Sequence, residues 1–178
     1  MQDKIVIREI LLSDIDEIMK MEYLSFPEEV WEKRELFLER IQVFKEGFLI
    51  MEIDGKKAGY MTSEIWNYKK ERDKSDFGIN HSIKKIHNIN GNELFITSFA
   101  VTPEFRNGGY GKYMFDFFIE KMIKKYNIVC ISLIVAEKWE KAIKIYLKNG
   151  FKILEKYDDF LISSKDYRDF LFMRKELE

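Results

Sequence analysis

Residues 101–111 read Val-Thr-Pro-Glu-Phe-Arg-Asn-Gly-Gly-Tyr-Gly, and this stretch decides how the rest of the chain is interpreted. It follows Leu94 to Val101, the most apolar strand-like run of the chain, and such runs are typical of strands buried on both faces. After it, Met114, Phe118 and Met122 recur at the spacing of one face of an amphipathic helix. The stretch therefore predicts a glycine-rich turn that leads from a buried strand into a helix.

The chemistry of this turn favours binding of an anion. Gly108, Gly109 and Gly111 let the main chain approach a ligand closely, and Arg106 and Lys112 add positive charge. The first N–H groups of a helix have no partner inside the helix, and the helix dipole favours an anion there. We therefore predict a pyrophosphate cradle, with an ordinary tight turn as the alternative. The glycine spacing fits neither a P-loop nor a dinucleotide fingerprint.

Two motifs, in this order, resemble those of the GCN5-related N-acetyltransferase (GNAT) superfamily. Residues 101–111 match each fixed position of Val-x-Pro-x-x-Arg-x-x-Gly-x-Gly, and residues 142–151 match Ala-x-x-x-Tyr-x-x-x-Gly-Phe. The resemblance implies a single N-acetyltransferase domain over residues 1–178. It also implies an α/β fold in which a central mixed sheet of six to seven strands is flanked by helices. The implied activity is transfer of an acetyl group from acetyl-CoA to a primary amine.

The remaining pattern predicts strands and helices that fit this fold. Strands are expected at 4–10, 48–53, 57–66, 94–101, 128–135, 151–154, 159–162 and 170–174. Helices are expected from 13 to about 24, from a start signal at 25–28 to about 46, after Gly111, and over 139–148. The polar segment 69–90 is too long for a plain hairpin connection, and we leave open whether it is a lid or a tolerated insertion.

The resemblance also implies roles for individual residues on the cofactor side. The main chain of Phe99, Ala100 and Val101 is expected to pair with the pantetheine arm like an added strand. The pyrophosphate is expected at the amides of Arg106, Asn107, Gly108, Gly109, Tyr110, Gly111 and Lys112. Ala142 belongs to the second motif, and Trp139, where the family often has Asn, is expected to pack against the pantetheine arm. Tyr146 holds the general-acid position, from which a phenol can protonate the leaving thiolate.

The general base is not given by these motifs. Many family members place a Glu where this chain has Thr97, and a threonine cannot serve as the base. His87, His81, Glu93 and Glu64 are the remaining candidates, and we take His87 as the first of them because of its intrinsic pKa. A water chain that carries the proton away is the alternative.

The implied fold would place Phe26, Glu29, Trp31 and Trp66 at the acceptor-binding side, and we predict the chemical class of the acceptor from them. Carboxylates beside aromatic rings suit a cation with an apolar body. We therefore predict a small-molecule amine, similar to an arylalkylamine or a polyamine. Two alternatives stay open, a protein N-terminus or lysine as the acceptor, and a non-catalytic sensor that binds acyl-CoA.

Composition excludes several other classes of function. The 178 residues carry 30 basic and 31 acidic side chains, a net charge of −1, which predicts no nucleic-acid partner. No apolar run is long enough to span a bilayer, so no membrane partner is expected. The single cysteine, Cys130, and the absence of a signal-peptide core predict a cytoplasmic protein. Two histidines and one cysteine are too few for a typical zinc site, so no metal is expected. A homodimer is left open.

Overall fold

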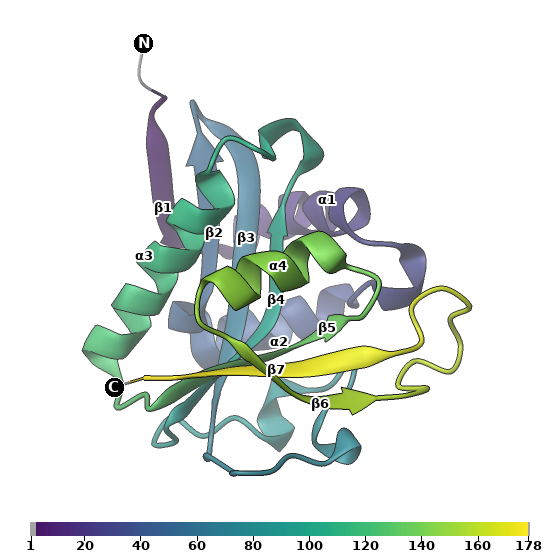
Figure 1. Ribbon diagram of the computed structural model, residues 1–178. Helices are drawn as coiled ribbons and strands as arrows, with labels where there is room; N and C mark the ends of the chain where they lie inside the picture. The colour runs from purple at the N-terminus through teal and green to yellow at the C-terminus, as the bar shows by residue number, and fades with distance from the viewer. Residues whose placement is uncertain (1–2, 178) are drawn as a thin grey trace.

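A computed structural model describes residues 3–177 and contains one mixed sheet of seven strands within them (Figure 1). The strand order is β1-β2-β3-β4-β5-β7-β6. The strands are β1 (Ile5–Glu9), β2 (Phe48–Ile53), β3 (Lys56–Trp66), β4 (Glu93–Val101), β5 (Cys130–Ala136), β6 (Lys152–Tyr157) and β7 (Phe170–Glu176). Among these, β4 and β5 pair in parallel and the other neighbours pair antiparallel. The predicted fold class is confirmed.

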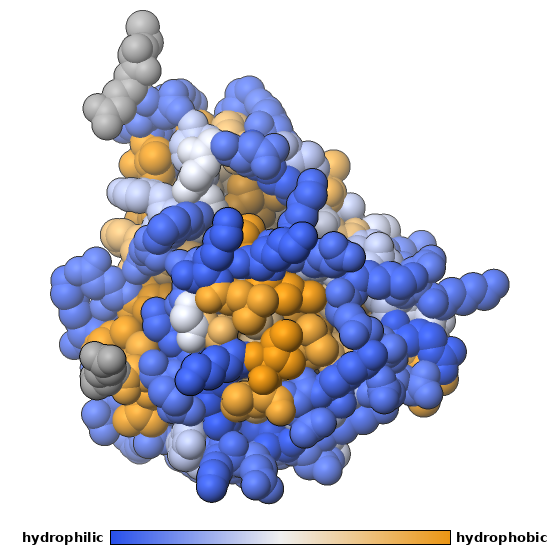
Figure 2. All heavy atoms as spheres, viewed as in Figure 1, coloured by the Kyte–Doolittle hydropathy of each residue, from blue (hydrophilic) through white to orange (hydrophobic). Residues whose placement is uncertain are grey.

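Helices cover both faces of the sheet. The helices are α1 (Ile15–Ser25), α2 (Arg34–Phe44), α3 (Tyr110–Lys125) and α4 (Glu140–Lys148). In Figure 1, α3 and α4 lie in front of the sheet and α1 and α2 lie behind it. The predicted apolar face of α3 is confirmed, since Met114, Phe118 and Met122 have no exposed surface. Apolar side chains remain visible beside α4 on the front face, ringed by polar ones (Figure 2).

Two of the predicted elements are wrong. The second helix begins at Arg34 and not near Pro27, because Glu28–Val30 forms a short 3₁₀ turn and Trp31 then leaves the helical region with ψ 133°. The segment 159–162 is a turn and not a strand. Asp159 there has a φ of 50°, and the chain folds back through a hydrogen bond from Leu161 N–H to Arg168 C=O.

The polar segment between β3 and β4 packs against the rest of the fold. It contains two 3₁₀ turns, Lys74–Asp76 and Ile83–Lys85. The Ser82 hydroxyl donates a hydrogen bond to Glu39 on α2 at 2.6 Å, and Ile83 is almost fully buried. Phe77, from the same segment, packs on Trp66 and Phe95. The segment therefore forms part of the core and contributes one wall of the site described next.

Candidate active site

The two central parallel strands separate toward their carboxyl ends. Their pairing runs from Glu93 opposite Cys130 to Ile96 opposite Leu133 and then stops. Beyond that point β4 stays paired with β3 as far as Val101, while β5 follows β7. A register shift in the β3–β4 pairing between Thr62 and Ser63 lies at the same level, and such bulges bend a strand. Residues 97–101 therefore face a gap on their β5 side.

A cavity of about 1130 Å³ opens at this gap. Its walls come from both separated strands, the start of α3, α4, the end of α1, and the segments before β4 and β7. Residues 97–101 line it continuously, and Leu133, Ile134 and Val135 line it from β5. The cavity therefore reaches the unpaired edge of β4, where an extended ligand can pair with the main chain.

The glycine-rich turn forms one end of the cavity. Gly109 caps α3 with a φ of 79°, in the left-handed region that favours glycine. The Arg106 side chain fixes the entry to the turn, since its Nε donates a hydrogen bond to the Val101 carbonyl at 2.9 Å. Of the predicted pyrophosphate residues, five line the cavity, Arg106, Asn107, Gly109, Gly111 and Lys112. Gly108 and Tyr110 do not line the cavity, and the Tyr110 hydroxyl donates a hydrogen bond to the Asp3 carboxylate.

Tyr146 lies on the α3–α4 side of the gap, on α4. Its ring packs between Phe115 and Phe151, with centroids 6.2 and 5.6 Å away, and it lines the cavity together with Ala142 and Trp139. Burial raises the pKa of the Tyr146 phenol to about 12, so the hydroxyl keeps its proton at neutral pH. A protonated phenol at this position can act as a general acid.

A cluster of buried ionisable side chains lies at the α1–α2 side of the cavity. Glu22, Glu32, Arg40 and His81 all line it. Arg40 is 2% exposed, and its Nη2 lies 2.5 Å from Glu32 Oε2. Within residues 3–177, Nη1 of Arg40 has no hydrogen-bond partner. The cavity therefore combines a main-chain edge, an apolar region around the Tyr146 phenol and a cluster of charged side chains.

Comparison with known proteins assigns this architecture. Residues 13–151 match the model of the Acetyltransferase (GNAT) family. The chain belongs to this family. An N-alpha-acetyltransferase of Sulfurisphaera tokodaii is 28% identical over 147 residues, which cover 82% of this chain and 79% of that protein. The GNAT chain is therefore an acyl-CoA-dependent N-acetyltransferase with acetyl-CoA as its donor.

Two solved structures show how closely the GNAT fold is kept at low identity. The loading GNATL domain of CurA from Lyngbya majuscula has a TM-score of 0.83 at 12% identity, covering 97% of this chain and 98% of that one. Arabidopsis thaliana Naa50, in complex with the bisubstrate analogue CoA-Ac-MVNAL, has a TM-score of 0.73 at 19% identity, covering 97% and 99%.

The predicted base of this GNAT enzyme, His87, lies outside the cavity. Its Nδ1 accepts a hydrogen bond from Ile65 N–H at 3.1 Å, and its ring packs on Phe44. Burial lowers the pKa of His87. Glu93 also lies outside, where it accepts hydrogen bonds from Arg72, Arg174 and Ser132 beneath the parallel pairing. Both side chains therefore hold the fold together at a distance from the gap, and we drop both as candidate bases.

His81 and Glu64 form a pair beside the cavity. His81 Nε2 lies 2.7 Å from Glu64 Oε1, and its Nδ1 lies 2.7 Å from the Gly78 carbonyl. Burial by itself would lower the pKa of His81, but the bond to Glu64 outweighs it and the pKa is raised. Because both ring nitrogens face acceptors, this geometry favours the doubly protonated ring, which can donate both hydrogen bonds. His81 fixes the position of residues 78–81 and has no nitrogen left to take a proton.

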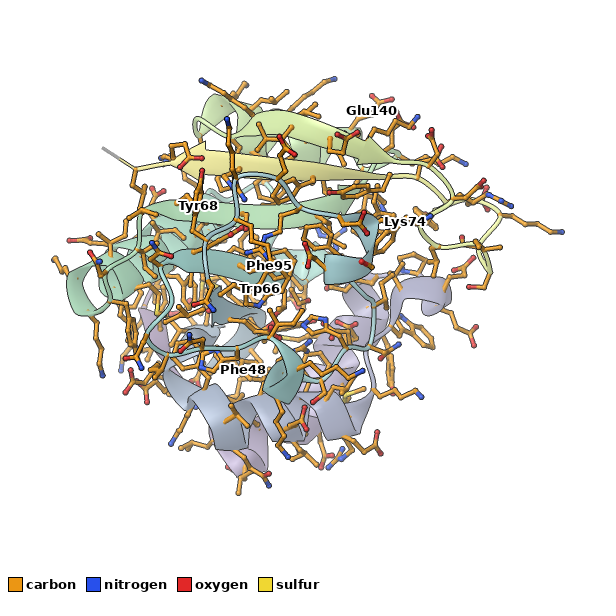
Figure 3. All side chains as sticks on the ribbon, turned by 90° about the horizontal axis from the view of Figure 1, so that it is seen from below. Phe48, Trp66, Tyr68, Lys74, Phe95 and Glu140 are labelled. Carbon is orange, nitrogen blue, oxygen red and sulfur yellow. The ribbon has the colours of Figure 1, made fainter. Side chains whose placement is uncertain are left out.

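Of the four predicted acceptor residues, Phe26 lines the cavity and the others do not. Glu29 is exposed, and Trp31 donates its indole N–H to the Phe26 carbonyl at 2.8 Å. Trp66 is fully buried and stacks on Phe95 at 4.0 Å, which Figure 3 shows in the interior of the molecule. The expected pairing of carboxylates with aromatic rings therefore does not form in the cavity.

Sequence reasoning missed Glu22 and Arg40, although a signal for both was present. Glu22 follows Ile15, Ile18 and Met19 on the buried face of α1. Arg40 lies among Phe37, Ile41 and Phe44 on the buried face of α2. A charged residue on the apolar face of an amphipathic helix needs a buried partner or a site.

Among residues 3–177 no group of three or more His, Cys, Asp or Glu side chains is arranged to hold a metal ion. Within the same range no helix has the length and apolar character that crossing a membrane requires.

Proposed function

We propose that this enzyme acetylates the α-amino group at the N-terminus of a peptide. The observation that carries this proposal is the make-up of the acceptor side of the cavity. Its walls are apolar, from Phe26 and Val30 after α1, Ile79 before β4, and Tyr167 and Phe170 at β7. Its inner end is charged. Such a pocket suits an amine attached to a carbon that carries an apolar side chain, which is the chemistry of a peptide N-terminus.

The cofactor side supports a donor bound in an extended form along β4. The unpaired edge of residues 97–101 offers main-chain groups that suit the two amides of the pantetheine arm. The turn at the start of α3 offers free N–H groups and the charge of Lys112 to the pyrophosphate. These residues fit coenzyme A.

Tyr146 is proposed as the general acid. The thiolate of coenzyme A needs a proton as it leaves, and a phenol that keeps its proton in an apolar setting can give it. The ring is held by Phe115 and Phe151, so the direction of the hydroxyl is set by packing. Trp139 and Phe26 both line the cavity, and their ring centroids lie 5.7 Å apart.

The choice of a peptide over a small-molecule amine rests on two facts. Glu29, Trp31 and Trp66, which favour an organic cation in the sequence, do not line the cavity. The relative from Sulfurisphaera tokodaii is named for α-amino groups, and the Arabidopsis thaliana structure holds a peptide linked to coenzyme A. We therefore favour an α-amino group, and a small-molecule amine is the competing result of the experiment.

The experiment measures thiol release from acetyl-CoA with three kinds of acceptor at equal concentration. The first is a short peptide with a free α-amino group and an apolar first residue. The second is the same peptide with a blocked N-terminus and an internal lysine, and the third is a set of arylalkylamines and polyamines. We expect turnover with the first kind alone, with the acetyl group located by mass spectrometry. Faster turnover of the second or third kind would overturn the choice of acceptor.

A further inference from the structure

Glu22 is a carboxylic acid buried beside the cavity whose chemistry the roles above do not use. It is 1% exposed, on the last turns of α1, and it lines the cavity. Its Oε2 accepts a hydrogen bond from the Tyr60 hydroxyl, and its Oε1 accepts one from Glu32 N–H at 2.8 Å. Each carboxylate oxygen has a second lone pair, so the group can still accept a proton from a ligand or a water molecule.

We propose that Glu22 is the general base that takes the proton from the ammonium group of the acceptor, directly or through one water molecule. This role rests on the proposed acetylation of an amine in the cavity. It gives the enzyme the base that Thr97 cannot supply.

The position of Glu22 relative to the gap supports this role. The Tyr60 hydroxyl that bonds Glu22 lies 3.1 Å from the Ser98 hydroxyl, and Ser98 lines the cavity from β4. The next residue, Phe99, faces the opposite side of the sheet, where it packs on Phe115 beside Tyr146. Because α1 and α4 cover opposite faces of the sheet, the acid and the base flank the gap from two sides (Figure 1).

The other ionisable side chains beside the cavity are engaged in hydrogen bonds or ion pairs. Both nitrogens of His81 are engaged by acceptors, and Glu64 behind it accepts hydrogen bonds from His81 and from the Trp66 indole. Glu32 is paired with Arg40. Among the described residues that line the cavity, Glu22 is the carboxylate without a cationic partner within salt-bridge distance on the acceptor side.

The electrostatic setting tunes Glu22 for an α-amino group. Burial raises its pKa to about 7, against the lowering effect of the hydrogen bonds from Tyr60 and Glu32 N–H. The charge of Glu32 raises the pKa further, and that of Arg40 lowers it. An α-amino group has a pKa of about 7.7–8.0, whereas a lysine side chain has one of about 10.4. Proton transfer to Glu22 is therefore nearly balanced for an α-amino group and strongly uphill for an alkylamine.

The proton inventory of the reaction closes with these two residues. The acceptor ammonium gives one proton to the Glu22 carboxylate, and the free amine attacks the thioester carbon to form the C–N bond. The C–S bond then breaks, and the departing sulfur takes the proton of the Tyr146 hydroxyl. The nitrogen loses its second proton, through water, to the Tyr146 phenolate. The products are the amide and the free thiol, and Glu22 releases its proton to solvent.

The first test compares Glu22→Gln with the wild type and with Glu17→Gln. Glutamine keeps the size of the side chain and an oxygen for Glu32 N–H but cannot take a proton. Glu17 is a partly exposed residue of the same helix that forms an ion pair with Lys20, so its variant controls for loss of a negative charge on α1. We expect Glu22→Gln to lower kcat/KM at pH 6.5 by up to roughly 20-fold, because only about one α-amino group in twenty is unprotonated there, and Glu17→Gln to leave it unchanged.

The pH dependence separates a base from a merely structural residue. Between pH 6.5 and 9.5 the free-amine fraction of an α-amino group rises by about 20-fold, so the acceptor needs the base less as the pH rises. The deficit of Glu22→Gln should therefore narrow by about that factor over this range. A deficit equal at every pH, or no deficit, would overturn the proposal, provided that acetyl-CoA still raises the Tm of the variant.

A second variant, Tyr60→Phe, keeps the proposal testable if Glu22→Gln does not fold. The hydrogen bond from Tyr60 lowers the pKa of Glu22. Removal of the Tyr60 hydroxyl should therefore move the acidic limb of the pH profile of kcat/KM to higher pH than in the wild type. An unmoved limb would refute the role of Glu22. If the wild type acetylates another amine and not a peptide N-terminus, the proposed acceptor fails, and the same comparison then tests Glu22 on that amine.

Discussion

Replacement of Tyr146 by phenylalanine should slow the acetyl-transfer step strongly while leaving the fold intact. The variant loses one hydroxyl, and the ring keeps its contacts with Phe115 and Phe151. Burial is the cause of the raised pKa of Tyr146, and no hydrogen bond from another described residue contributes. The change in the free energy of unfolding should therefore stay within about 0.5 kcal/mol.

The expected loss of rate follows from the role of the hydroxyl. General acids contribute roughly 10²- to 10⁴-fold, and each factor of ten corresponds to about 1.36 kcal/mol of transition-state stabilisation. The kcat of Tyr146→Phe should therefore fall roughly 10²- to 10⁴-fold, which corresponds to a rise of about 2.7–5.4 kcal/mol in the activation free energy. The affinity for acetyl-CoA should change little. Because the pKa of the phenol is about 12, the wild type should not lose this acid below pH 10.

The assay for Tyr146→Phe follows thiol release at saturating acetyl-CoA, together with thermal unfolding with and without the donor. Tyr113→Phe is the matched control, because Tyr113 is on α3, 51% exposed, and does not line the cavity. A Tyr146→Phe enzyme that keeps its kcat within about threefold would refute the acid role, since general acids contribute at least about 10²-fold. A variant that no longer gains stability from acetyl-CoA would show that Tyr146 acts in binding instead.

Three further substitutions test the fold around the site. Gly109→Ala should cost about 1–2 kcal/mol in urea unfolding, because the position needs a φ of 79°, and should reduce the Tm gain from acetyl-CoA. Glu93→Ala should cost about 3–5 kcal/mol in the same measurement, because it leaves two buried arginines without their shared carboxylate. The raised pKa of His81 means that its contribution to stability is complete below about pH 6.5 and is lost as the pH rises through the folded-state value. Urea midpoints from pH 5.5 to 9 should fall more steeply in the wild type than in His81→Asn, which retains the contribution of Glu22; equal slopes would contradict the ion pair with Glu64.

The glycine-rich turn and the buried strand before it could be predicted from sequence because their determinants are local. A glycine at a positive φ and an apolar strand before a helix leave their mark within a few consecutive residues. The predicted turn is the N-terminus of α3, with Gly109 at a φ of 79°. The predicted mixed sheet is confirmed, and β4 lies at the middle of its strand order with β5 beside it.

The start of α2 shows where local signals fail. Ser25-Phe26-Pro27-Glu28 has the composition of a helix start, but the chain forms a 3₁₀ turn there and the helix begins at Arg34. The Glu22 carboxylate accepts a hydrogen bond from Glu32 N–H, and the Trp31 indole N–H donates one to the Phe26 carbonyl. These contacts hold residues 26–33 in an irregular path that no propensity encodes.

The acceptor side could not be predicted for the same physical reason. Its ionisable groups come from α1, the segment before α2, α2 itself and the segment before β4, which the fold brings together and the sequence keeps apart. His87 and His81 stand in one polar stretch of the sequence, yet one packs behind β3 and the other faces the cavity. Composition cannot separate the two, because burial and hydrogen-bond partners decide which nitrogen is available.

The division of the site between main chain and side chains has a consequence for specificity. On the donor side, the groups proposed to bind acetyl-CoA are amides of β4 and α3, which substitution of most side chains would leave in place. On the acceptor side, burial raises the pKa of Glu22 to about 7, and this pKa also responds to Tyr60, Glu32 and Arg40. A change at any of these residues would alter the amine that can be deprotonated while donor binding stays intact. Under the proposed role of Glu22, the choice of acceptor is set by the electrostatics of the α1–α2 face, and it can vary without any change to the glycine-rich turn.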